Sequence, residues 1–113
     1  MTIYISSGTI YSPSERRVAT ELLVHEKDTD SEGHLTEVIV WRVDPNSRQP
    51  DGFRYRFAFV PHGSKEPAIL YDNHHPKGHH RHVGGREVAY RFSTIAQLQA
   101  DFRAEVAAWR GKP

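Results

Sequence analysis

Residues 53–60, FRYRFAFV, alternate between aromatic and cationic side chains over the length of a strand. Successive side chains of a β-strand point to opposite faces of a sheet, so every second residue shares a face. The segment therefore predicts a strand with one aromatic face that requires a core and one basic face that can stay in water. The basic positions are Arg54 and Arg56, and the aromatic positions are Phe53, Tyr55, Phe57 and Phe59.

Four further segments have the β-branched and aromatic composition of strands. The strongest is LTEVIVWRV, residues 35–43, and the others cover residues 17–26, 68–73 and 87–92. Glycine and proline interrupt the chain between them, where an antiparallel sheet needs turns. We therefore expect an antiparallel sheet of about five strands.

The last part of the chain changes from a period of two to a spacing of three or four. This spacing predicts an amphipathic helix over residues 93–110, with Thr94 and Gln97 as a capping box and Gly111 as the stop. Its apolar stripe needs a partner, and the aromatic face of residues 53–60 supplies one. The stripe consists of Ile95, Leu98, Phe102, Val106 and Trp109.

Together these segments predict an α+β fold in which the C-terminal helix packs on one face of the sheet. With 113 residues, of which 37% are hydrophobic, the chain fits a single domain over residues 1–113. We expect residues 1–15, which are rich in Ser, Thr and Tyr, to form an irregular arm. There is no apolar run of membrane-spanning length and no secretory signal pattern, so no membrane association and a cytoplasmic location are expected.

The stretch YDNHHPKGHHRHVGGRE, residues 71–87, holds five of the eight histidines within nine residues. One hypothesis is a metal site, because His80 and His82 project to the same side if the segment is extended, and Asp72 could add an oxygen ligand. The chain has no cysteine, so a zinc site would have to use histidine and carboxylate ligands. The sequence defines fewer ligands than a metal site normally needs, and we expect no bound metal or cofactor.

The second hypothesis is acid and base catalysis on a phosphodiester. Cleavage of RNA without a metal needs a base for the 2′-OH proton, an acid for the departing 5′-oxygen and cations that stabilise the phosphate. Histidine can serve as base and as acid near neutral pH, which assigns these two roles to His80 and His82. Lys77 and Arg81 could hold the phosphate. Asp72 could orient an imidazole, and Tyr71 could contact the substrate.

The third hypothesis is a binding surface without catalysis. No acidic residue occurs from His74 to Arg86, so this segment is locally basic although the net charge of the chain is only +1. Arg54 and Arg56, together with Arg86, could follow a nucleic-acid backbone. The histidines without periodic placement, which we interpret as loop residues without a catalytic role, are His74, His75 and His79.

The succession YDN, KGHHRH and YRF, followed by a helix with L-x-x-x-F, resembles the TumE family of small toxins from toxin–antitoxin pairs. The similarity extends from about Val18 through Trp109. It implies a cognate antitoxin, commonly one with a helix-turn-helix DNA-binding domain, and it implies no particular reaction. The positions that match the motif are Tyr71, Asp72, Asn73, Lys77, Gly78, His80, Arg81, His82 and Tyr90.

The residue patterns and the resemblance together predict a small endoribonuclease toxin that uses metal-independent histidine catalysis on RNA. Two alternatives stay open at this point: a non-catalytic module that binds nucleic acid or protein, and a metal-dependent nuclease that uses His80, His82 and Asp72. The unpaired edges of a small sheet would also allow homo-oligomerisation or the addition of a partner strand.

Overall fold

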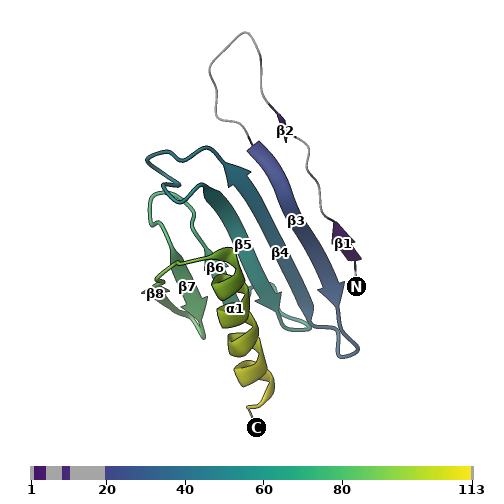
Figure 1. Ribbon diagram of the computed structural model, residues 1–113. Helices are drawn as coiled ribbons and strands as arrows, with labels where there is room; N and C mark the ends of the chain where they lie inside the picture. Colours follow the sequence, from purple (N-terminus) through teal and green to yellow (C-terminus); the bar gives the residue numbers. More distant parts are fainter. Residues whose placement is uncertain (1, 5–8, 11–19, 113) are drawn as a thin grey trace.

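The computed structural model describes residues 2–4, 9–10 and 20–112 of the chain. These residues form one antiparallel sheet with one helix on one of its faces (Figure 1). The elements are β1 (Thr2–Tyr4), β2 (Thr9–Ile10), β3 (Thr20–Thr29), β4 (Leu35–Val43), β5 (Phe53–Val60), β6 (Ile69–Asp72), β7 (His80–Val83), β8 (Arg86–Ala89) and α1 (Ile95–Arg110). The spatial order is β1-β3-β4-β5-β6-β7-β8, and β2 also pairs with β3.

The structure confirms the predicted α+β class and enlarges the predicted set of strands. The two most regular segments of the sequence are β4 and β5, with the predicted bounds. A strand that the sequence did not predict is β7, which lies in the histidine-rich stretch and pairs with β6. Gly84 and Gly85 then turn the chain with positive φ angles into β8, which begins one residue before the predicted segment 87–92 and ends within it, at Ala89.

The irregular arm expected over residues 1–15 lies mostly outside the described residues. Its two described pieces are β1 and β2, which pair antiparallel with residues 25–27 and 20–21 of β3. Backbone hydrogen bonds to β3 provide a partner that the polar composition of this segment did not indicate. These two pieces are therefore strands and not irregular chain.

The register of the central strands gives the sheet two chemically different faces. On the face that carries α1, Phe57 lies opposite Tyr71, and both side chains are 1% exposed. On the other face, which we call the open face, Arg56 lies opposite Asp72. Because side chains alternate along each strand, every second residue of β4 to β8 belongs to the open face. The core on the α1 side contains Val38, Val40, Tyr55, Phe57, Phe59, Ile69, Tyr71, Leu98 and Phe102.

The apolar stripe of α1 packs against the aromatic face of β5, as the sequence predicts. Leu98 and Phe102 are buried, and the Phe102 ring lies 5.5 Å from the Phe57 ring in an edge-to-face arrangement. Near the end of the helix, Trp109 packs on Phe59 with the ring centroids 5.0 Å apart. The other two residues of the stripe, which are partly buried against the same core, are Ile95 and Val106.

The caps of α1 agree only in part with the predicted capping box. Thr94 accepts a hydrogen bond from Gln97 N at 3.0 Å, which is the first half of the motif. The Gln97 side chain does not return to Thr94; it donates to Asp101 one turn further along the helix, at 2.8 Å. The helix ends at the predicted position, where Gly111 N donates to Ala107 O at 3.0 Å.

Replacement of Phe57 by alanine should lower the free energy of unfolding by about 3–5 kcal/mol, because the buried ring would leave a cavity beneath α1. Chemical denaturation followed by circular dichroism measures this change. The matched control is Arg103→Ala on the exposed side of α1, which should change the same quantity by less than about 0.5 kcal/mol. A loss below about 1 kcal/mol for Phe57→Ala would contradict the assigned core.

Candidate functional site

Strand β7 distributes the predicted site residues between the two faces of the sheet. Its register pairs His80 with Asp72 and Arg81 with Tyr71 of β6. Side chains alternate along the strand, so His80 and His82 lie on the open face, whereas Arg81 lies on the face of α1. The structure therefore brings the two histidines together with Asp72 and separates them from Arg81 and Tyr71.

His80 is held at both of its ring nitrogens. Its Nε2 lies 2.8 Å from Asp72 Oδ1, its Nδ1 lies 2.8 Å from the Gly78 carbonyl oxygen, and the residue is 6% exposed. A carbonyl and an ionised carboxylate only accept hydrogen bonds, so the ring satisfies both contacts only when each nitrogen carries a proton. Only the imidazolium form of His80 can donate at both contacts, and this is also the form that can give up a proton.

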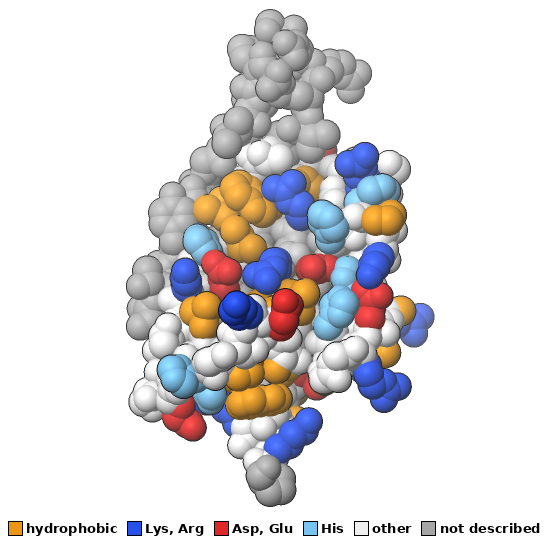
Figure 2. All heavy atoms as spheres, turned by 180° about the vertical axis from the view of Figure 1, so that it is seen from behind, with side chains coloured by type: hydrophobic (Ala, Val, Ile, Leu, Met, Phe, Trp, Pro, Cys, Tyr) orange, Lys and Arg blue, Asp and Glu red, His pale blue; other side chains and the backbone are white. Residues whose placement is uncertain are grey.

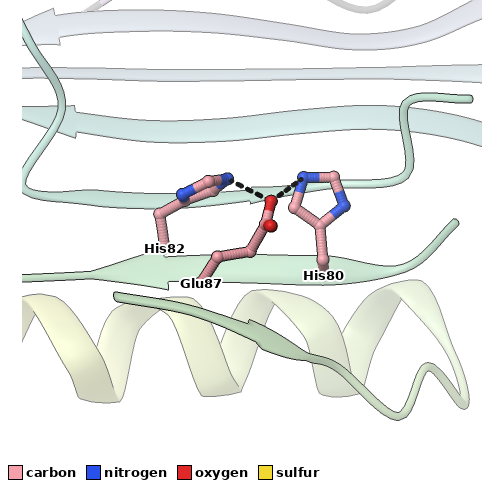
Figure 3. Close-up of side chains that lie close together, drawn as sticks. All are labelled: His80, His82 and Glu87. Carbon is pink, nitrogen blue, oxygen red and sulfur yellow. Dashed lines mark ion pairs between the residues drawn. The ribbon is translucent and has the colours of Figure 1, made fainter. Parts of the chain in front are cut away.

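His82 pairs with a second carboxylate, that of Glu87, which lies opposite it on β8 (Figure 3). Its Nε2 lies 3.1 Å from Glu87 Oε1, and the Nε2 of His80 lies 3.8 Å from the same oxygen. The His82 side chain is 35% exposed, and its Nδ1 forms no hydrogen bond with a residue that the structure describes. If Nε2 donates to Glu87, Nδ1 keeps a free lone pair that can accept a proton.

Glu87 also binds a lysine. Lys77 Nζ lies 2.6 and 3.0 Å from the two Glu87 oxygens. This hydrogen bond is the main cause that holds the pKa of Glu87 below its ordinary value of 4.5, and the charges of His82 and His80 act in the same direction. The carboxylate is therefore ionised at neutral pH, and it links Lys77 to both imidazoles.

The same cluster has the donor atoms of a metal site. The ligand atoms of His80, His82 and Glu87 lie within 4.8 Å of one another, and two imidazoles with a carboxylate suit zinc and other divalent transition metals. The predicted metal set therefore changes, since Glu87 takes the third position and Asp72 is the hydrogen-bond partner of His80. Lys77 opposes a metal ion there, because two cations would compete for one carboxylate.

Arg81 and Tyr71 belong to a separate group beneath the end of the sheet. Arg81 forms an ion pair with Glu105 of α1 and lies 3.4 Å from the Tyr71 hydroxyl, which donates to Glu105 at 3.2 Å. Burial raises the pKa of Tyr71, and the hydrogen bond from Arg81 opposes this shift. With Tyr90 and Asp101 these residues border a cavity of about 550 Å³. The group connects β7 to α1 and faces away from the two histidines.

The three arginines predicted to bind nucleic acid also lie on different faces. Arg54 and Arg56 lie on the open face, where Arg56 is opposite Asp72. Figure 2 shows this face, on which cationic, acidic and histidine side chains lie close together. Arg86 lies opposite Val83, and Val83 is two residues from Arg81 on β7. Arg86 and Arg81 therefore share the face of α1, away from the two histidines. Only Arg54 and Arg56 are therefore neighbours of the histidine cluster.

His79 has a structural environment on the α1 side of the sheet. Its Nδ1 lies 2.8 Å from the Tyr55 hydroxyl, its Nε2 lies 2.6 Å from Asp51 Oδ2, and its ring stacks on Phe92 at 4.7 Å. Burial raises the pKa of Tyr55, so its hydroxyl stays protonated at neutral pH. The two histidines that are exposed in the loop before β7 are His74 and His75.

Asn73, the last residue of the YDN motif, binds the backbone of β5. It is 2% exposed, its Oδ1 accepts from Tyr55 N at 3.0 Å, and its Nδ2 donates to Phe53 O at 2.7 Å. The side-chain amide thus continues the pairing with β5 after β6 has ended at Asp72. The three motif residues therefore do different things: Tyr71 packs in the core, Asp72 binds His80 and Asn73 aligns two strands.

Sequence reasoning did not single out Glu87, although a signal for it exists. A two-residue hairpin turn at Gly84 and Gly85 pairs residue 83 with residue 86 and therefore His82 with Glu87. Two adjacent glycines, Gly84 and Gly85, are the sequence signal for such a turn. The carboxylate of the site could have been predicted from that register.

Comparison with known proteins identifies a family. A family model described as "Toxin TumE" matches residues 4–110, which is nearly the whole chain. The protein is therefore the toxin component of a toxin–antitoxin system, and a cognate antitoxin is implied. The chain belongs to the TumE toxin family.

No curated protein and no solved structure matches the chain. Within the residues that the structure describes, no helix has the length and apolarity that crossing a membrane requires. Family membership and the geometry of the open face are thus the two findings on which a function can be argued.

Replacement of Lys77 by methionine should raise the pKa of Glu87 toward 4.5, because the hydrogen bond from Lys77 is the main cause of its depression. An NMR titration of the Glu87 carboxyl carbon measures the change. A carboxylate with a depressed folded-state pKa stabilises the fold above its unfolded-state pKa, and this contribution disappears as the pH falls through the folded-state value. The loss of stability in acid should therefore become shallower in Lys77→Met.

The control for this titration is Lys65→Met, which removes an exposed lysine of the β5–β6 loop. It should leave the pKa of Glu87 unchanged. If Lys77→Met also leaves that pKa unchanged, Lys77 and Glu87 are not in contact in solution.

Proposed function

We propose that this toxin is an endoribonuclease whose active site is the pair of histidine–carboxylate contacts on the open face. The observation that carries this proposal is the position of His80 and His82, whose ring centroids lie 5.2 Å apart and each of which contacts a carboxylate of its own. Two imidazoles side by side match the two proton transfers that RNA cleavage requires.

The hydrogen bonds of the two rings suggest a division of roles. His82, with one ring nitrogen free, removes the proton of the ribose 2′-OH, and the 2′-oxygen attacks the adjacent phosphorus. His80, with a proton on each nitrogen, exchanges one of its two hydrogen bonds for the 5′-oxygen and gives that oxygen the proton as its bond to phosphorus breaks. The products are a 2′,3′-cyclic phosphate and a 5′-hydroxyl end. Asp72 and Glu87 orient the rings and stabilise their cationic forms.

Cations on the open face can bind the phosphates. A lysine ammonium has three donors, so Lys77 can contact Glu87 and still donate to a phosphate oxygen. Arg54 and Arg56 lie on the neighbouring strand β5 and can bind flanking phosphates of the same RNA. The proposal leaves Arg81 and Tyr71 outside the reaction, because Glu105 holds Arg81 on the face of α1.

The donor cluster of His80, His82 and Glu87 supports a second candidate, a metal-dependent nuclease. A divalent ion at this position would polarise the phosphate and activate a water molecule. Such an ion would have to displace Lys77 from Glu87, where the ammonium lies 2.6 Å from the oxygen that also faces His82. This competition favours the metal-independent mechanism, and a chelator separates the two candidates.

Single replacements His80→Ala and His82→Ala should each reduce RNA cleavage by roughly 10²-fold or more, since each removes one proton-transfer group. Gel analysis of a labelled RNA measures the rate, and growth inhibition measures toxicity. Cleavage by the unaltered protein should persist in excess chelator and leave 2′,3′-cyclic phosphate ends.

The matched control is His25→Ala, because His25 also lies on the open face and contacts a carboxylate, Glu37, at 3.3 Å. It should cleave RNA at the rate of the unaltered protein. Loss of cleavage in chelator would support the metal-dependent candidate. Full activity in both His80→Ala and His82→Ala would place the active site elsewhere. If the purified protein cleaves no RNA at all, the remaining candidate is a binding module without catalysis.

We further propose that the cognate antitoxin covers the open face. The resemblance of this chain to the TumE toxins also suggests that the antitoxin carries a helix-turn-helix domain. A nuclease must be silenced at the surface where its substrate binds, and here that surface includes Arg54, Arg56 and the histidine cluster. The proposed RNA substrate would place the action of the toxin in the cytoplasm.

The affinity of the toxin for its antitoxin should fall as salt concentration rises, because charged contacts at such an interface are screened. Titration calorimetry at two salt concentrations measures this dependence, and Arg54→Gln should reduce it. The counterpart Arg103→Gln, on α1, should not. A salt-insensitive complex that leaves Arg54 and Arg56 exposed would contradict this interface.

A further inference from the structure

A small pocket on the open face lies directly beside the histidine cluster. It spans β4, β5 and β6, has a volume of about 170 Å³, and is lined among others by Ile39, Trp41, Arg54, Arg56 and Asp72. Asp72 is shared, because its carboxylate forms one wall of the pocket and also contacts His80 at 2.8 Å. The pocket and the histidines are therefore separated by a single residue.

The lining of this pocket combines an aromatic ring with cations. Trp41 is partly buried on β4, and the Arg54 guanidinium lies 5.6 Å from the centroid of its ring. Within the described part of the chain Arg54 pairs with no carboxylate, and Arg56 has only a long contact of 3.5 Å with Glu37. Figure 2 shows apolar surface next to Lys or Arg side chains on this face.

We propose that the pocket binds one unpaired base of single-stranded RNA, which stacks on Trp41 while Arg54 binds its phosphate. Aromatic rings next to cations are the surface on which proteins bind single strands, because every base offers a flat face and every nucleotide a phosphate. A duplex cannot supply this base, since its bases are stacked on one another. The catalytic consequence rests on the function proposed above.

The position of the pocket fits the delivery of a phosphodiester to the histidines. The pocket ends at β6, and β7 follows at one strand spacing of about 4.8 Å. Trp41 itself stands on β4, three strand spacings or about 14 Å from β7, so a strand whose base stacks on Trp41 would place a phosphodiester a few nucleotides further along over His80 and His82. Trp41 becomes a substrate-positioning residue, and the enzyme should prefer unpaired regions of RNA.

Trp41 fluorescence tests this inference in a Trp109→Phe background, where Trp41 is the one remaining tryptophan. The probe is a mixed-sequence 2′-O-methyl oligonucleotide of about ten nucleotides, which lacks the nucleophile and so cannot be cleaved. The single strand should quench Trp41 saturably, and the same strand annealed to its complement should not. If Trp109→Phe fails to fold, the contribution of Trp41 is obtained by subtracting the fluorescence quenching of Trp41→Phe from that of the unaltered protein.

Variants separate stacking from charge. Trp41→Leu should weaken binding of the oligonucleotide by roughly 5- to 150-fold, which corresponds to the loss of one stacked base, whereas Trp41→Phe should retain most of the affinity. Arg54→Gln should weaken binding and reduce its salt dependence, and Arg103→Gln on α1 should do neither. Thermal unfolding of each variant identifies any loss of fold.

The outcomes distinguish this inference from the proposed reaction. Quenching by the single strand without cleavage of unmodified RNA would support the pocket and overturn the ribonuclease proposal. Cleavage of RNA without any change in Trp41 fluorescence would overturn the pocket and leave the ribonuclease proposal standing. Equal quenching by the duplex would overturn the pocket, as would a Trp41 that responds to the antitoxin but not to RNA, which would mark a protein-docking surface.

Discussion

The pairing of β6 with β7 is the constraint on which the rest of this structure depends. It places Asp72 opposite His80 and Tyr71 opposite Arg81, and a slip by one residue would exchange the groups on the two faces. Such a slip would also remove Tyr71 from beneath α1, where its ring packs at 5.9 Å from that of Phe102. Burial of the α1 side therefore holds the register that assembles the open face.

The site on the open face is a network in which Asp72 binds His80 and Glu87 is shared by three basic side chains. His80 is almost completely buried, and a buried imidazolium is tolerated only with partners at hydrogen-bonding distance, here Asp72 and the Gly78 carbonyl. Glu87 receives Lys77 and His82 and lies within 3.8 Å of His80. Because the members share contacts, the loss of Glu87 would remove a partner of Lys77 and of His82 at once.

The two faces of the sheet carry different groups. On the α1 side, Arg81 and Glu105 join β7 to the helix and thereby hold the strand that carries the histidines. On the open face, the pocket at Trp41 and the histidine cluster form one continuous surface through Asp72. An antitoxin that covers this surface would exclude RNA by occupying the same groups, so inhibition would require no change in the toxin's shape.

The sequence by itself determined the sheet, the helix and their contact, because the alternation of residues 53–60 and the spacing of the C-terminal stripe are local patterns with one periodicity each. It also placed the candidate site in the histidine-rich stretch, which stays a prediction. Only the tertiary structure decided that Arg81 points away from His80 and that Trp41 stands beside the cluster. The physical reason is that a side chain's face depends on strand register, and this register is set by packing beneath α1 between residues far apart in the chain.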